Sequence, residues 1–126
     1  STHPLIQAED CGACHIPKNW PMKRLPREKI LTLCLGCHKN VLQEQSGVQN
    51  LTKFRNNESN LHFIHGGDKN KIPCLTCHDG HGSNQLHLIR LRRTNSREAL
   101  TIIYTATEKG GKCTASCHTT RSYERN

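Results

Sequence analysis

The stretch Cys74-Leu75-Thr76-Cys77-His78 decides how this chain is held together, because its pattern occurs three times and a close variant of it occurs once. Every cysteine of the chain belongs to one of these motifs, and each motif ends in a histidine. The four motifs are Cys11–His15, Cys34–His38, Cys74–His78 and Cys113–His118. The first three read CxxCH, and the fourth reads CxxxCH, with one additional residue between its cysteines. Such a repeat indicates one chemistry at four places.

The rest of the composition is poor in apolar side chains. Only 33% of the 126 residues are hydrophobic, and the formal net charge is +8, which is close to the composition of disordered chains. A domain of this length normally buries a large apolar core to offset the loss of chain entropy. We therefore expect a bound group to hold this chain together.

The CxxCH pattern is the attachment signature of c-type haem. Its two thiols add to the vinyl groups of the porphyrin, and the adjacent histidine gives the iron a proximal nitrogen. Disulfides, a zinc site and a thioredoxin-like redox motif are the alternatives. None of them explains why a histidine follows every pair, so the sequence favours four covalently bound haem c groups.

The chain resembles the multihaem c-type cytochromes, in particular those with doubled CxxCH motifs. The most specific stretches are Leu61–His65 and Cys74–Ser83, where the family often has a CHDPHGS-like sequence and this chain has Gly80 in place of the frequent Pro. The ending Gly110–Tyr123 is also similar to such cytochromes. CxxxCH variants occur among c-type haem sites.

The histidine count predicts two axial histidines for each iron. The covalent attachment residues are Cys11, Cys14, Cys34, Cys37, Cys74, Cys77, Cys113 and Cys117, and the proximal ligands are His15, His38, His78 and His118. The distal candidates are His3, His62, His65 and His81, with His87 in reserve. Ligation by two histidines closes both faces of an iron and is typical of an electron carrier.

Chain reach limits which histidine caps which iron. Three extended residues span at most about 11 Å, so His81 lies too close in sequence to His78 to cap the same haem. We expect it to cap another one. His62 and His65 are three residues apart and would share one face of a helix, from which they can reach two haems.

The fold class we expect is mostly irregular and α, with little secondary structure, a small β-hairpin and a packed row of four haems. One domain would cover residues 1–126. It would comprise an N-terminal arm (1–10), the first two haem motifs (11–45), a connecting loop (46–60) and the third and fourth haem motifs (61–126). Pro26 and the apolar spacing after it predict a helix, while residues 86–92 and 100–106 predict the hairpin, with Thr94-Asn95-Ser96 between its strands.

These features predict a protein of electron transfer and not an enzyme. The first hypothesis is a periplasmic carrier; the alternative is a subunit of an extracellular cytochrome filament, in which His3 would ligate a haem of a neighbouring copy. A reductase with one open haem is less favoured by the histidine count. The resemblance implies a periplasmic or extracellular location after removal of a signal peptide. We expect redox proteins, extracellular acceptors or further copies as partners, and neither nucleic acid nor a membrane span.

Overall fold

The computed structural model describes residues 1–15, 27–44, 52–93 and 100–126. Short helices carry the first three motifs: the 3-10 turn η1 (Cys11–Ala13), helix α2 (Arg27–Cys37) and helix α5 (Cys74–Cys77). In each motif the amide of the histidine donates to the carbonyl of the first cysteine. The N···O distances are 2.8 Å in the first motif and 2.9 Å in the second and third. One helical turn therefore gives all three CxxCH motifs the same local hydrogen bond.

The predicted helix of the second motif is confirmed. α2 begins at Arg27 and ends at Cys37, and Glu28 lies in its first turn, where a carboxylate is favoured by the helix dipole. The Pro26 predicted to start this helix lies outside the described residues.

The C-terminal part of the chain forms an antiparallel sheet in the order β3-β4-β5-β6. Its strands are β3 (Arg92–Arg93), β4 (Leu100–Ala106), β5 (Gly110–Ala115) and β6 (His118–Glu124). The fourth motif bridges β5 and β6: Cys113 pairs with Arg121, Ala115 pairs with His118, and the register shifts between Cys113 and Ala115. A bulge accommodates one extra residue in a strand, so CxxxCH here belongs to a hairpin and not to a helical turn.

The predicted hairpin is confirmed only where Arg92 and Arg93 pair with Thr101 and Leu100. Residues 86–88 form the 3-10 turn η3 (Leu86–Leu88), so the prediction of a strand there is wrong. His87 and Leu88 both have positive φ angles, 56° and 57°, which interrupt an extended strand. Residues 94–96 lie outside the described residues, and the pairing of β5 with β6 was not expected.

The segment predicted as a connecting loop contains more structure than expected. Beyond residues 45–51, which are not described, it holds the short hairpin of β1 (Arg55–Asn56) and β2 (Ser59–Asn60), and it leads into helix α4 (Leu61–Gly66). Asn60 is 2% exposed. Its side chain caps α4 by accepting from the amides of His62 and Phe63, and it donates to the carbonyls of Val41 and Gln43, each at 2.7 Å. One amide side chain therefore ties α4 to the segment that follows α2.

The N-terminal arm is docked on its own chain. Helix α1 (Pro4–Gln7) follows His3, its N-cap residue, whose backbone is extended. Thr2 forms a β-bridge with Gly82, and the amide of His3 donates to the carbonyl of His81 at 3.1 Å. This bridge places the N-terminal arm beside the residues that follow the third motif.

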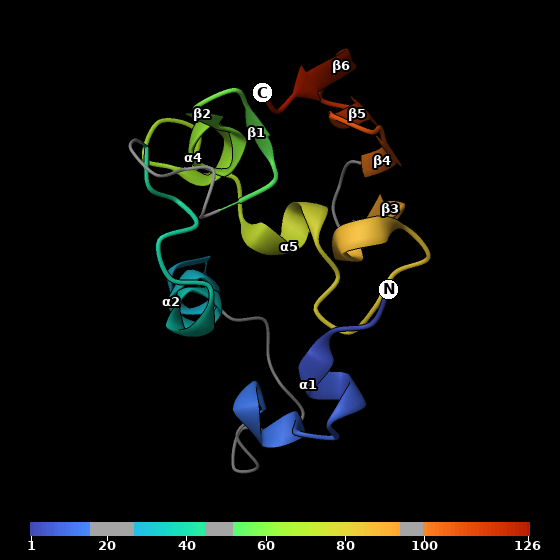
Figure 1. The fold of residues 1–126 in the computed structure, drawn as a ribbon. Helices are drawn as coiled ribbons and strands as arrows, with labels where there is room; N and C mark the ends of the chain where they lie inside the picture. The colour runs from blue at the N-terminus through green and yellow to red at the C-terminus, as the bar shows by residue number, and fades with distance from the viewer. Residues whose placement is uncertain (16–26, 45–51, 94–99) are drawn as a thin grey trace.

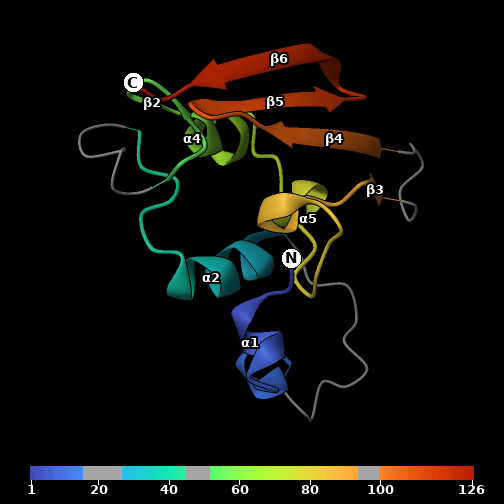
Figure 2. The ribbon, with the colours of Figure 1, turned by 45° about the vertical axis from the view of Figure 1, so that its right-hand side comes forward.

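In both ribbon views α1 lies at the bottom, α2 and α5 lie above it, and α4 lies near the top at about the height of the sheet (Figures 1 and 2). Among the described residues, the buried apolar side chains are Ile102 and Tyr123. The chain therefore folds around little apolar core of its own, as its composition suggests.

Candidate haem sites

Each motif histidine lies opposite one histidine from outside the motifs. The distances between ring centroids are 6.0 Å for His15 and His81, 6.2 Å for His38 and His3, 6.2 Å for His78 and His62, and 6.4 Å for His118 and His65. We call these pairs, with the two cysteines of each motif, sites 1 to 4 in the order of the motifs. The four distal candidates are thus distributed one to each motif.

The spacing fits a metal ion held between the rings. Imidazole nitrogens bind a metal at about 2 Å, and each ring centroid lies about 1 Å behind its nitrogen, so two opposed ligands have centroids about 6 Å apart. The four ring pairs have this separation. The residues present therefore fit an iron with two histidine ligands at each site.

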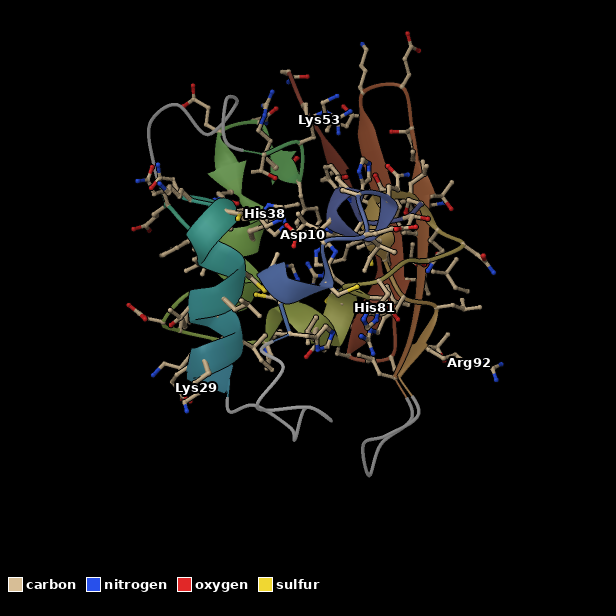
Figure 3. All side chains as sticks on the ribbon, turned by 90° about the horizontal axis from the view of Figure 1, so that it is seen from below. Asp10, Lys29, His38, Lys53, His81 and Arg92 are labelled. Atoms are coloured by element: carbon tan, nitrogen blue, oxygen red, sulfur yellow. The ribbon has the colours of Figure 1, made fainter. Side chains whose placement is uncertain are left out.

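The elements explain how these histidines come to face each other. His62 and His65 lie on one helix, α4, and reach His78 after α5 and His118 on β6. His81 faces the first motif and not the third, which agrees with its closeness in sequence to His78. Figure 3, seen from below, shows the N-terminal segment between α2, which leads to His38, and the loop with His81. Tertiary structure thus brings together residues that are far apart in the sequence.

Backbone carbonyls set the proton position on three of these rings. The Nδ1 atom of His65 lies 2.7 Å from the carbonyl of Leu61, that of His78 lies 3.0 Å from the carbonyl of His87, and that of His118 lies 2.6 Å from the carbonyl of Thr119. A carbonyl only accepts hydrogen bonds, so each Nδ1 is the donor. The lone pair is then left on Nε2, the nitrogen available to a metal.

His62 is held by Thr52. Its Nδ1 lies 3.0 Å from the Thr52 hydroxyl oxygen, which also accepts from the amide of Phe54 at 2.9 Å. Burial lowers the pKa of His62 to about 4, and the neighbouring histidines, first His78, add to the effect. Burial likewise lowers the pKa of His78. Both rings are therefore neutral at pH 7, which is the form that binds a metal.

His3 has the opposite arrangement. Its Nδ1 accepts from the amide of Leu5 at 3.2 Å, as the N-cap of α1. In a neutral ring the proton then lies on Nε2. Binding of a metal through Nε2 requires that this hydrogen bond be broken, so His3 is less well prepared as a ligand than the histidines of sites 3 and 4.

The cysteines of successive motifs are neighbours in space. A hydrogen bond with Cys74, together with burial, raises the pKa of the Cys34 thiol, and Cys14 is close enough to add to this rise. Burial raises the pKa of Cys77 to about 11, with smaller contributions from Cys113 and Cys117. Site 1 therefore adjoins site 2, site 2 adjoins site 3, and site 3 adjoins site 4.

The reserve candidate His87 is not opposite a motif histidine. Its exposed side chain lies against Tyr104, with ring centroids 5.8 Å apart. Its carbonyl instead accepts from His78, and Arg90 donates to the carbonyl of His78 at 2.8 and 3.1 Å. No sequence pattern indicates these roles of Arg90, Thr52 and Asn60, because hydrogen bonds to backbone groups and ring nitrogens leave no motif.

Disulfides and a zinc site are the alternative interpretations of the cysteines that the structure bears on. None of the eight cysteines forms a disulfide. Within the ranges that the structure describes, no group of three or more histidine, cysteine or acidic residues is arranged to hold a metal ion by itself. No described helix has the length and apolar character needed to cross a membrane.

Comparison with known proteins agrees with the chemistry of the motifs. A family model described as the doubled CXXCH motif matches residues 3–43, which include the first two motifs and His3. No curated protein and no solved structure matches the chain. The match supports a protein similar to the multihaem cytochromes c, and the motifs indicate covalently bound c-type haem with iron and a general role in electron transfer.

Proposed function

We propose that the chain transfers electrons through four c-type haems, each with two axial histidines, as a periplasmic carrier. The observation that carries this proposal is the set of four histidine pairs, each joining one motif histidine to one other histidine at 6.0–6.4 Å. Bound haem supplies a one-electron iron couple. With both axial positions taken by side chains, the sites leave no face for a substrate, so we propose no enzymatic activity.

The chain contributes attachment, orientation and burial. The cysteines would hold the haems covalently, and the histidines of each pair would hold the iron from both sides. The hydrogen bonds of His65, His78 and His118 orient their Nε2 atoms in advance. The closeness of the cysteines in successive motifs supports a row in the order of the sequence, with sites 1 and 4 at its ends.

The four pairs are complete within a single chain. Ligation by His3 of a haem in another copy is therefore not needed to fill the sites, and this favours the carrier over the filament subunit. Redox proteins on the outer side of the cytoplasmic membrane would be its partners. Electron microscopy of the purified native protein separates the two proposals, since we expect dispersed particles and a filament would overturn the carrier.

Mass spectrometry and spectroscopy test the sites themselves. We expect an intact mass that exceeds the chain mass by four haems, and low-spin six-coordinate iron at all four sites. A protein with fewer haems, or with a high-spin signal from a quarter of its iron, would contradict the proposal.

A further inference from the structure

One aromatic side chain contacts the distal histidines of two sites. The ring of Phe54 lies edge-on to His62, with centroids 5.0 Å apart and ring planes at 78°. The same ring lies against His65, with centroids 5.7 Å apart and planes at 30°. Aromatic pairs at such separations are attractive and prefer defined orientations. Phe54 thus contacts both histidines that α4 presents.

The position of Phe54 is itself fixed from several directions. Its amide donates to the Thr52 hydroxyl at 2.9 Å, and its carbonyl accepts from the amide of Leu61, the first residue of α4, at 3.1 Å. Its ring also lies edge-on to the buried Tyr123 on β6, with centroids 5.3 Å apart. A residue held through both its backbone and its ring can restrict the orientation of the histidines beside it.

We propose that Phe54 is a positioning residue that fixes the ring planes of His62 and His65 together. The inference rests on the proposed function, in which these two rings are the distal ligands of sites 3 and 4. The planes of His62 and His78 are at 20°, and those of His65 and His118 are at 49°. Hydrogen bonds hold Nδ1 of each distal ring at one point, and the face and edge of Phe54 restrict rotation about that point.

Electron paramagnetic resonance is the direct readout. The signal of low-spin ferric iron with two imidazole ligands depends on the angle between the two ring planes, so rotation of a ligand shifts the signal of its own site. In Phe54→Leu we expect two of the four ferric signals to shift, together with the reduction potentials of two sites, while the other two signals stay as in the unaltered protein.

Two matched variants assign the effect. Thr52→Val removes the hydroxyl that bonds to His62 but not to His65, and that also accepts from the Phe54 amide, so the signal of site 3 should shift more than that of site 4. Phe63 lies on α4 between the two histidines and contacts Gly67, so Phe63→Leu should leave all four signals unchanged. If Phe54→Leu fails to retain four haems by mass, Phe54→Met keeps a similar volume without a flat ring and should give the same two shifts.

The outcomes separate this inference from the proposed function. Four low-spin irons in the unaltered protein with no shift in Phe54→Leu or Phe54→Met would overturn the role of Phe54 alone. Shifts in all four signals, or equal shifts in Phe63→Leu, would also overturn it, because they indicate a general loosening. An unaltered protein that already contains an open iron would instead overturn the proposed ligation.

Discussion

Sites 1 and 2 are built differently from sites 3 and 4. In sites 3 and 4 all four histidines are partly buried, and each has an Nδ1 partner that is compatible with a free Nε2. In sites 1 and 2, His38 and His81 are exposed, and Nδ1 of His3 accepts from an amide. Attachment motifs of similar sequence therefore do not give equally prepared iron sites. Preparation comes from the segments that pack around them.

The largest effect should come from removing the attachment at site 3. Cys74 lies beside Cys34, and Cys77 lies beside the cysteines of site 4, so the group bound there would contact both neighbours. Replacement of Cys74 and Cys77 by Ala should give a protease-sensitive chain throughout. The same replacement of Cys11 and Cys14, which are exposed at one end, should leave residues 52–126 resistant. Equal sensitivity of both variants to limited proteolysis would remove the distinction between the two halves.

A smaller loss is expected when the connection between the halves is cut. Asn60→Ala removes the cap of α4 and the donors to Val41 and Gln43. Loss of an N-cap costs about 1 kcal/mol, and each lost hydrogen bond to a backbone carbonyl about 1 kcal/mol more. Denaturant titration should therefore show a free energy of unfolding lower by about 3 kcal/mol. Asn70→Ala, which removes one exposed bond to the carbonyl of Ile64, is the control and should have a much smaller effect.

His3→Ala should change one iron without changing the fold. The covalent bonds come from cysteines, so four haems should remain by mass. One quarter of the iron should become high-spin, because His3 is the ring opposite His38. Light scattering should report an unchanged particle size. Loss of assembly in this variant would revive the filament, and an unchanged spectrum would show that His3 binds no iron.

The smallest effect concerns the amide that competes for His3. Leu5→Pro removes the donor to Nδ1, at a position in the first turn of α1 where proline is tolerated. One hydrogen bond is worth about 1 kcal/mol, so displacement of His3 by added cyanide should become about fivefold weaker. Leu5→Ala retains the amide and should bind cyanide as the unaltered protein does. Weaker binding in both variants would mean that the side chain, and not the amide, matters.

Parts of the fold followed from local rules that the sequence displays. The helix at the second motif was predicted from its apolar spacing, and α2 confirms it. The sequence does not predict the pairing of β5 with β6, because apolar and polar residues do not alternate clearly along these two strands. The turn at His87 and Leu88 was missed because positive φ angles at residues other than glycine have no reliable sequence signal.

The sequence by itself determined the attachment chemistry, because two thiols and the adjacent histidine act within one turn of chain and need no distant partner. It also limited the distal ligands to five candidates by counting. Only the tertiary structure decided that His81 faces the first motif, that His62 and His65 divide between two motifs, and that His87 contributes a carbonyl instead of a ring. Those choices depend on contacts between segments far apart in the chain, and such contacts are fixed by packing and hydrogen bonding and not by spacing along the sequence.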